Sequence, residues 1–375
     1  MTQAKSAYIG ARIFDGAALR DDHALLVLSD GETRIIGPQD IPSNCATHSL
    51  DGGILLSGFV DLQVNGGGVM FNDAPTVKTL ATIAAAHRGL GTAAILPTLI
   101  TDTPSQTAAA IKAVTDALDQ GIPGIAGLHL EGPHLSVARK GAHDGTLIRP
   151  MQDSDLRGLL DAVDHIPNLM MTVAPESVTN AQIRAMADAG IIVSLGHSDC
   201  DYGTAMAAFD AGARCATHLF NAMSQAQARA PGLVGAALDH GGAASGLIAD
   251  AVHVHPAMIR AALAANQGPS EVFLVTDAMA TAGSDITSFT LNGREILRSD
   301  GRLTLADGTL AGADLTMPQA IRVMVEQVKD PLEKALARAT TIPAGMLSSS
   351  PSRNRADDML WLSQDMTKTC WIAEL

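Results

Sequence analysis

The sequence predicts an α/β protein: a TIM-like (β/α)8 barrel with a small, discontinuous, β-sandwich-like domain formed from both chain ends. Two observations favour this fold. Apolar runs alternate with Ala-rich helical segments over roughly the 250 residues that such a barrel needs. Outside that region, short strand-like runs are separated by turn residues. The expected domains are the small β domain, residues 1–53 plus 346–375, and the barrel, residues 54–345.

Pairs of Asp with Gly or Asp punctuate the chain before the barrel, which is typical of turns between short antiparallel strands. Two apolar runs near the C-terminus have the same short, strand-like character, and we expect them to return to the same small domain. The strand-like runs at the two ends of the chain are residues 7–14, 24–28, 33–36, 359–362 and 370–372.

Eight apolar runs in the middle of the chain predict the barrel strands, and the Ala-rich segments between them predict the helices around it. A doubly wound open sheet would need a GxGxxG loop after its first strand, and Gly66-Gly67-Gly68 lacks that spacing. The barrel is therefore favoured. Its expected strands are 55–64, 92–97, 125–130, 169–173, 191–195, 214–217, 245–248 and 272–276, and its expected helices include 77–89, 105–118, 180–189 and 202–211.

The alternation of strand and helix is interrupted after Asp277. Turn pairs of Asn or Asp with Gly separate three short apolar runs there, which predicts an inserted, hairpin-like segment. Two helical segments follow and should complete the barrel. The three apolar runs are 289–291, 295–297 and 303–305, and the two helices are 317–328 and 331–339.

Composition limits the possible functions. The chain has 375 residues, of which 47% are hydrophobic and 17% charged, so a sizeable core is expected. A formal charge of -14 argues against nucleic acid or an anionic membrane as a partner, and an anionic substrate would need a local positive pocket. The four cysteines are scattered and predict no disulfide framework, and the N-terminus lacks the apolar run of a signal peptide. We therefore expect a cytoplasmic protein.

Four residues that can bind metal or transfer protons end four of the predicted strands. Glu131, His197 and His218 close the third, fifth and sixth strands, and Asp277 closes the eighth. The carboxyl ends of barrel strands open on one mouth, so these side chains should converge. Two imidazoles and one carboxylate form a known catalytic metal set with an open position for water. Asp277 would then serve as the general base.

Each of these residues alone has a simpler explanation. A single histidine at a strand end is more often structural than a ligand, and only their number at one end of the barrel reverses those odds. His143 and His253 also fall on the expected mouth, whereas His134 has no assigned role. Asn221 and Arg229 follow the sixth strand and could clamp an anion, or they could belong to a loop that caps the next helix.

Five motifs, in their order along the chain, resemble the N-acetylglucosamine-6-phosphate deacetylases, a family of the amidohydrolase superfamily. The likeness spans about residues 57–347, and the motifs are far more specific together than any one of them alone. They are HLEGP at 129–133, GHS at 196–198, THLFNAM at 217–223, PGLVGA at 231–236 and TDAMA at 276–280.

The resemblance implies hydrolysis of the acetamide of N-acetyl-D-glucosamine 6-phosphate to D-glucosamine 6-phosphate and acetate. It implies an amino-sugar phosphate as the small-molecule partner, and a homodimer in which Arg229 serves its own site or that of the neighbouring subunit. The implied roles are Glu131, His197 and His218 as metal ligands, Asp277 as the acid/base, His143 as the group that polarises the acetyl carbonyl, and Asn221, Ala222, Arg229 and His253 as the residues that hold the sugar phosphate.

Many members of the superfamily carry His-x-His at the end of the first strand and bind two metals. Here Gln63 and Asn65 stand at those positions, and amides are poor transition-metal ligands beside imidazole. We therefore expect one divalent metal ion per subunit, with Gln63 and Asn65 hydrogen-bonded to water or substrate. Zn2+ is the ion we expect first, and Fe2+, Co2+ or Mn2+ would also bind such a site.

The sequence leaves other functions open. Another amidohydrolase could act on a different phosphorylated N-acyl sugar. A metal-independent phosphosugar isomerase could use Asp277 as its base, but the three predicted ligands would then have no joint purpose. A catalytically silent sugar-phosphate sensor would have no need of Asp277. No motif distinguishes N-acetylglucosamine 6-phosphate from N-acetylgalactosamine 6-phosphate.

Overall fold

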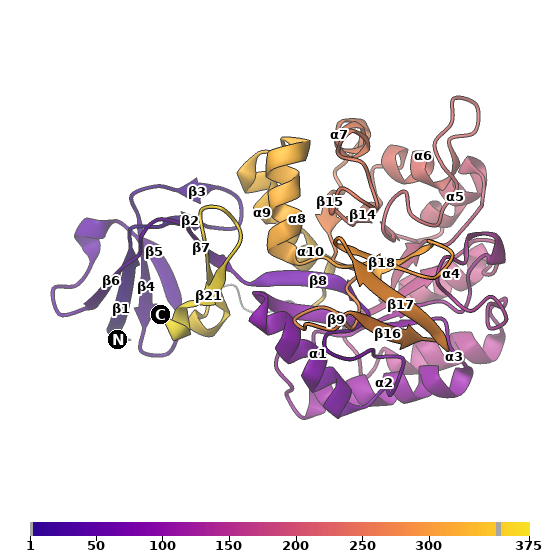
Figure 1. The fold of residues 1–375 in the computed structure, drawn as a ribbon, viewed down its shortest axis with the longest axis horizontal. Helices are drawn as coiled ribbons and strands as arrows, with labels where there is room; N and C mark the ends of the chain where they lie inside the picture. Colours follow the sequence, from indigo (N-terminus) through magenta and orange to yellow (C-terminus); the bar gives the residue numbers. More distant parts are fainter. Residues whose placement is uncertain (1–2, 350–353) are drawn as a thin grey trace.

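The computed structural model describes residues 3–349 and 354–375. A small β domain, in which both ends of the chain lie, sits beside a larger α/β barrel along the longest axis (Figure 1). This arrangement confirms the predicted fold class, whereas the residue boundaries of the two domains stay a prediction. No helix among the described residues is long and apolar enough to cross a membrane.

The small domain consists of two β-sheets whose buried faces share a hydrophobic cluster. Tyr8 and Leu25 enter this cluster from the first sheet, and Ile13 and Leu55 enter it from the second. The first sheet has the order β5 (Thr33–Ile36), β4 (Ala24–Leu28), β1 (Ala4–Ile9) and β6 (Ala46–Ser49), and the second has the order β21 (Thr369–Trp371), β20 (Met359–Leu362), β7 (Ile54–Ser57), β2 (Arg12–Phe14) and β3 (Leu19–Arg20).

The predicted strand 7–14 is wrong, because this run divides between the two sheets as β1 and β2. The break falls at Gly10, which has a φ of 84°. A Cβ there would lie 2.3 Å from the carbonyl oxygen of Leu50, so this turn requires glycine. At the other end of the chain, β20 pairs antiparallel with β7, so the C-terminal run returns to the small domain as predicted.

Eight strands form the barrel wall, and each pairs in parallel with its neighbours in sequence order. The predicted first strand, 55–64, divides at Gly58 into β7 of the small domain and β8 of the barrel. A Cβ on Gly58 would lie 2.6 Å from Trp371 and 2.7 Å from Ala93, so only glycine fits where the chain passes between the two parts. The barrel strands are β8 (Phe59–Val64), β9 (Thr92–Ile100), β10 (Leu128–Glu131), β11 (Leu169–Val173), β12 (Ile192–Leu195), β13 (Cys215–Ala216), β14 (Ala244–Leu247) and β15 (Val272–Leu274).

The barrel closes between β15 and β8 through a short seam just beyond the end of β15. The backbone N–H of Asp277 donates to the carbonyl of Gln63 at 3.0 Å, and that of Asn65 donates to Ala278 at 2.8 Å. Just before the seam, the hydroxyl of Thr276 donates a hydrogen bond to the carboxylate of Asp61. The seam therefore fixes the backbone of Asp277 at the mouth of the barrel.

Helices surround the barrel (Figure 1), and side chains cap several of their N-termini. The hydroxyls of Thr76 and Thr103 and the carboxylate of Asp201 each accept a backbone N–H from the first turn. The predicted helix 317–328 is α8 followed by a π-helical turn, Met324–Val328. The helices are α1 (Val77–Gly89), α2 (Pro104–Asp119), α3 (Asp153–Ala162), α4 (Asn180–Asp188), α5 (Tyr202–Asp210), α6 (Gly232–Asp239), α7 (Pro256–Ala265), α8 (Met317–Val323), α9 (Leu332–Ala339) and α10 (Thr341–Met346).

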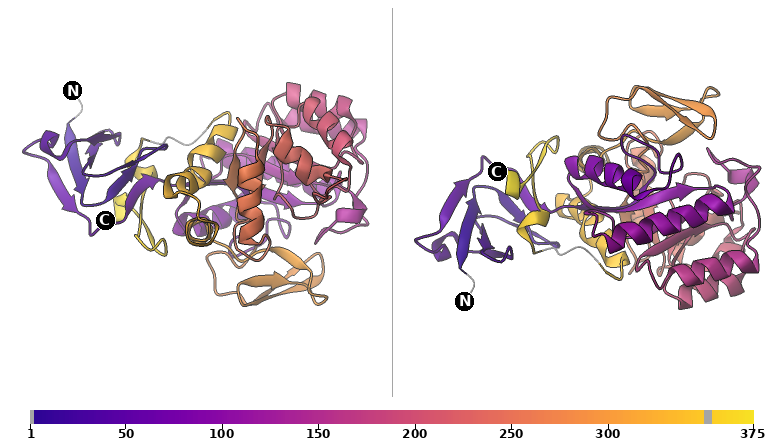
Figure 2. Two further views of the ribbon diagram at one scale, coloured as in Figure 1. Left: turned by 90° about the horizontal axis from the view of Figure 1, so that it is seen from above. Right: turned by 90° about the horizontal axis from the view of Figure 1, so that it is seen from below.

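The inserted segment is an antiparallel sheet of four strands that stands out from one side of the barrel (Figure 2). Three of its strands were predicted and the fourth, β19, was not, because its small residues carry no alternating apolar pattern. β19 joins the sheet to the barrel, since the N–H of Ala313 donates to the carbonyl of Asp277 at 3.0 Å. The strands are β16 (Ser288–Leu291), β17 (Arg294–Ser299), β18 (Arg302–Thr304) and β19 (Leu310–Ala313).

Candidate active site

A cavity of about 370 Å³, the central pocket, opens at the carboxyl ends of the barrel strands. This is the place where a barrel of this type presents catalytic side chains. Every site residue predicted from the sequence lines this pocket except Gln63 and Arg229. The predicted residues that line it are Asn65, Glu131, His143, His197, His218, Asn221, Ala222, His253 and Asp277.

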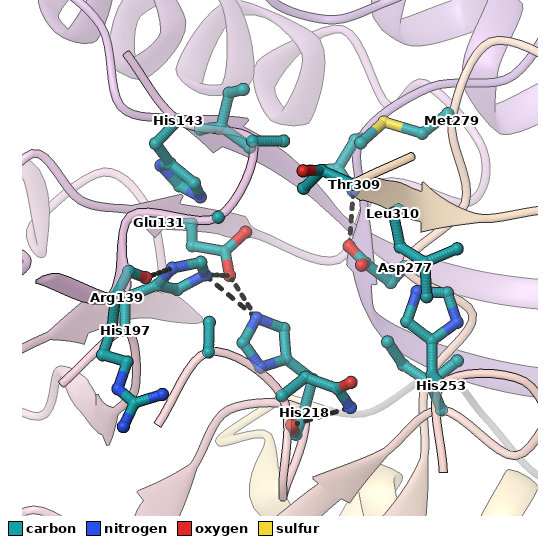
Figure 3. Close-up of a pocket in the computed structure, with 18 of the residues that line it drawn as sticks. Glu131, Arg139, His143, His197, His218, His253, Asp277, Met279, Thr309 and Leu310 are labelled. Carbon is teal, nitrogen blue, oxygen red and sulfur yellow. Dashed lines mark hydrogen bonds and ion pairs between the residues drawn. The ribbon is translucent and has the colours of Figure 1, made fainter. Parts of the chain in front are cut away.

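Glu131, His197 and His218 form a compact ligand cluster on one wall of the pocket (Figure 3). Oε1 of Glu131 lies 3.1 Å from Nε2 of His197 and 3.0 Å from Nε2 of His218. The two Nε2 atoms are 3.0 Å apart. All three side chains are buried, so three potential ligand atoms face one point with little access to bulk water.

The hydrogen bonds of His197 indicate that this cluster suits a cation. Nδ1 of His197 lies 2.8 Å from the backbone carbonyl of Arg139, which can only accept, so Nδ1 carries the proton of the neutral ring. Nε2 is then unprotonated, and its lone pair faces the carboxylate oxygen of Glu131. Two lone pairs at this distance repel each other unless a positive charge lies between them. The donor set and its orientation therefore fit a divalent metal ion.

Burial and charge also shift the protonation of the cluster. Burial alone would raise the pKa of Glu131. Without an ion, protons on His197 and His218 take the place of that positive charge, and their hydrogen bonds and charge hold the pKa of Glu131 well below its usual range. Burial would lower the pKa of His218, yet Glu131 and Asp277 together raise it. The wall thus favours a carboxylate anion beside groups of positive charge, as a metal site does.

Two of the predicted metal ligands and the predicted base have left-handed backbone conformations, which non-glycine residues rarely adopt. The φ angles are 48° for His197, 29° for His218 and 51° for Asp277. Each of these residues comes shortly after a barrel strand, where the chain turns away from the wall. Such strain persists only where the surrounding structure fixes it, and it is typical of functional positions.

His143 lies beside the ligand cluster, with its ring centroid 4.4 Å from that of His197. Glu131, His143 and His197 place ligand atoms within 4.8 Å of one another, so His143 is also near enough to be a ligand. Nδ1 of His143 lies 2.8 Å from the hydroxyl of Thr101 and accepts the backbone N–H of the same residue at 3.3 Å, and a backbone N–H can only donate. The neutral ring therefore carries its proton on Nε2, opposite to His197. Burial lowers the pKa of His143 well below its usual value, which keeps the ring neutral. This histidine fits a hydrogen-bond donor better than a metal ligand.

Asp277 lies on the opposite side of the pocket from the ligand cluster (Figure 3). Two amide side chains from β8 and its extension hold it in place. Nε2 of Gln63 donates to Oδ1 of Asp277 at 3.2 Å and to Glu131 at 3.1 Å, and Nδ2 of Asn65 donates to Oδ1 at 2.7 Å. Burial, together with the charge of Glu131, raises the pKa of Asp277 to about 6. Gln63 and Asn65 thus orient the carboxylates of the site.

The remaining predicted residues divide between two cavities. Asn221, Ala222 and His253 line the central pocket, and Nδ1 of His253 contacts the carboxylate of Asp250 at 2.6 Å. Arg229 is exposed and lines a neighbouring cavity of about 440 Å³ instead. The structure therefore does not bring Arg229 together with the other predicted site residues within one chain.

Several lining residues escape prediction from the sequence. Arg139 is the last residue of a short 3-10 helix, Val137–Arg139, in the connection after β10. Its side chain pairs with Asp199 at 2.7 Å, and its carbonyl orients His197. Met279, Thr309 and Leu310 reach the pocket through the inserted sheet and its connection to Asp277. The only available signal was their proximity in sequence to Asp277 and to the insertion, which does not indicate a wall of the pocket.

Both the sequence and the fold of this chain are similar to those of known proteins. The model of the amidohydrolase family matches residues 54–350. The chain belongs to the amidohydrolase family. The N-acetylgalactosamine-6-phosphate deacetylase of Shewanella sp. (strain ANA-3) is 41% identical over 332 residues, which cover 87% of this chain and 84% of that protein. The N-acetylglucosamine-6-phosphate deacetylase of Haemophilus influenzae is 36% identical over 344 residues, 91% of this chain and 89% of that protein.

A solved structure agrees with these sequence relatives. The crystal structure of N-acetylglucosamine-6-phosphate deacetylase from Pasteurella multocida superposes with a TM-score of 0.89 at 36% identity, and the match covers 96% of each chain. This amidohydrolase neighbour has the same fold over nearly its whole length, small domain included. The resemblance drawn from the five sequence motifs is confirmed.

Proposed function

We propose that this protein hydrolyses the acetamide of N-acetyl-D-glucosamine 6-phosphate to D-glucosamine 6-phosphate and acetate. The observation that carries the proposal is the presence, in one pocket, of the ligand cluster and of a carboxylate with a raised pKa. Amide hydrolysis uses both, because water must be activated and the leaving amine must receive a proton. The substrate class comes from the relatives, which are deacetylases of amino-sugar 6-phosphates.

Glu131, His197 and His218 would hold one divalent ion per subunit, and Zn2+ is the ion we expect with this donor set. A divalent ion bound there lowers the pKa of water and polarises a carbonyl oxygen. Gln63 supports one-ion binding, because its amide already donates to the carboxylates of Glu131 and Asp277. The amide thus presents a hydrogen-bond donor, not a ligand atom, to the two carboxylates.

Asp277 accepts a proton from the attacking water and returns it to the amine nitrogen as the C–N bond breaks. Two amides donate to Oδ1, so the carboxylate keeps one orientation and Oδ2 is the oxygen that exchanges the proton. A pKa of about 6 suits both steps. The group is mostly ionised at pH 7, yet it is basic enough to take the proton.

His143 donates a hydrogen bond from Nε2 to the acetyl oxygen, where negative charge develops during attack. The contact of Nδ1 with the N–H of Thr101 supports this role, because it keeps the ring proton on the other nitrogen. Donors held in advance at such a position stabilise the transition state more than the substrate. Neutral His143 can donate without adding a second positive charge to the cluster.

The sugar phosphate would lie at the end of the pocket lined by Asn221, Ala222 and His253. Arg229 would reach the phosphate from the neighbouring subunit of a cytoplasmic homodimer. Its exposure, and its place in a cavity beside the central pocket, support a role across a subunit interface. The guanidinium of an arginine can donate to two phosphate oxygens at once, and its positive charge offsets the overall negative charge of the chain.

A second candidate substrate is N-acetyl-D-galactosamine 6-phosphate, which differs only in the configuration of one hydroxyl. The relative from Shewanella carries this activity in its name and is 41% identical to this chain. The reaction, the ion and the roles of Glu131, His143 and Asp277 would be the same for both sugars. Only the contacts of the sugar ring would differ.

The test is acetate release from each 6-phosphate, measured as kcat/KM, with unphosphorylated N-acetylglucosamine as the control. We expect turnover of N-acetylglucosamine 6-phosphate and much weaker turnover of the control, because the phosphate contacts are lost. A kcat/KM more than about tenfold higher on the galactosamine substrate, a difference of about 1.4 kcal/mol, would reassign the substrate. No acetate from either phosphate would reject the proposed function.

A further inference from the structure

A chain of buried hydrogen bonds crosses the barrel below the central pocket and ends on His129. Nδ1 of His129 contacts the carbonyl of Leu62 at 3.1 Å, and Nε2 contacts the hydroxyl of Thr172 at 2.7 Å. The hydroxyl of Thr172 contacts that of Thr217 at 2.7 Å, which in turn contacts that of Ser194 at 2.6 Å. The side chains in this chain are buried within the barrel, and the proposed chemistry uses none of them.

The contact of His129 with the carbonyl of Leu62 determines which group donates in every hydrogen bond of this chain of side chains. The carbonyl of Leu62 can only accept, so Nδ1 of His129 carries the ring proton and Nε2 accepts from Thr172. Each hydroxyl has one proton, so Thr217 must donate to Thr172. Ser194 must then donate to Thr217. This single direction requires a neutral ring, which the complete burial of His129 favours.

The chain lies one layer of side chains below the ligand cluster. Alternate residues of a strand share a face, so His129 lies beneath Glu131 on β10. Thr217 directly precedes His218, and Ser194 lies on β12, which leads into His197. The chain therefore connects each strand that supplies a ligand with β11, which carries Thr172, and with β8, which carries Leu62 and Gln63.

We propose that His129 is a positioning residue that holds Glu131 and His218 in register for metal binding. It does so through this directed chain, without touching the ion or the substrate. The inference rests on the proposed metal site and does not depend on which sugar is the substrate. Groups that orient metal ligands from behind commonly change metal affinity by about 10–100-fold when they are lost.

The experiment measures the affinity of metal-free protein for Zn2+ alone, by competition with a chelator, in wild type and variants. His129→Leu removes the hydrogen bonds of the ring to Leu62 and Thr172. We expect the affinity for Zn2+ to fall by about 10–100-fold. Thr172→Val keeps the size of the side chain and removes the hydroxyl that donates to Nε2 of His129 and accepts from Thr217. We expect it to lose about tenfold, the lower end of that range.

His87→Leu is the matched control, because His87 is also buried and bonded to a backbone carbonyl, that of Gly66 at 2.9 Å. The midpoint of thermal unfolding of the metal-free protein should fall in His129→Leu and in His87→Leu. Zn2+ affinity should fall only in the first of these. A merely structural histidine would change the midpoint alone.

Thr172→Val keeps the test decisive if His129→Leu does not fold. A folded His129→Leu or Thr172→Val protein with Zn2+ affinity within about twofold of wild type, well below the range for ligand-orienting groups, would overturn the proposal. A wild type that binds Zn2+ but releases no acetate would reject the proposed function alone, because the affinities of the variants could still be compared.

Discussion

The two walls of the central pocket differ in the charged species that each is suited to bind. On the wall formed after β10, β12 and β13, the atoms of Glu131 and His197 face each other with no proton between them. On the wall formed at the seam of β8 and β15, Asp277 has hydrogen-bond donors but a raised pKa. The first wall is suited to a cation and the second to a proton. In the proposed function, the pocket thus separates activation of the carbonyl and water from proton transfer.

The largest effect should come from the first wall. Glu131→Gln keeps the shape of the side chain but removes the negative charge that balances the ion. We expect loss of bound metal and a fall in acetate release of about a thousandfold or more, since several kcal/mol of transition-state stabilisation is removed. Elemental analysis and a kinetic assay on the same preparation measure both. Undiminished turnover by a metal-free Glu131→Gln protein would remove the distinction between the walls.

A change in the second wall should affect the reaction without affecting metal content. Asp277→Asn removes the proton acceptor and keeps a side chain of the same size, so we expect kcat to fall by about 10²–10⁴-fold. Bound metal, measured by elemental analysis, should stay at the wild-type level. Loss of the metal in this variant would show that the two walls act as one unit.

The same carboxylate predicts the acid limb of the pH profile. The pKa of Asp277 is raised from 3.8 to about 6, so the group is protonated, and inactive as a base, below that pH. We expect kcat/KM to rise with pH and to level off above about pH 6. The residual activity of Asp277→Asn should lack this limb. An unchanged limb in that variant would assign it to another group.

His143 and His197 are neighbours whose opposite tautomers predict different phenotypes. His143→Ala removes a donor to the developing oxyanion, for which we expect a fall in kcat of about 10²–10³-fold with metal retained. His143→Gln, which can place an N–H near the same position, should recover part of that loss. If His143→Ala loses its metal instead, His143 is a ligand and belongs with His197.

The smallest effect should come from outside the pocket. Arg229→Ala removes a phosphate contact made before and during the reaction alike, so KM should rise by about tenfold while kcat changes little. Steady-state kinetics on N-acetylglucosamine 6-phosphate measure this, with Arg260→Ala, an arginine on α7 bonded to Gln327, as the control. A fall in kcat with unchanged KM would place Arg229 in the chemical step.

The first wall could be predicted from the sequence because each of its residues closes a strand. Glu131, His197 and His218 follow apolar runs, and a barrel brings the carboxyl ends of such runs together. The second wall was predictable only in part. Asp277 closes the last strand, but nothing in the sequence indicates that the amides of Gln63 and Asn65 both donate to one of its oxygens.

Contacts through the backbone account for most of what the sequence could not predict. The carbonyl of Arg139 fixes the tautomer of His197, and the N–H of Thr101 fixes that of His143. Any residue type has these groups, so no motif marks them. Thr309 and Leu310 reach the pocket because β19 joins the barrel at Asp277. The sequence of β19 has no alternating apolar pattern that would indicate this pairing.

The most direct test of the separation of tasks is acetate release from N-acetylglucosamine 6-phosphate before and after chelation, with bound metal counted in the same samples. We expect about one metal ion per chain, as one cluster of three ligands implies. Turnover should be lost on chelation and restored by Zn2+. Full turnover by metal-free protein would contradict the account, because the cluster of Glu131, His197 and His218 would then have no part in the reaction.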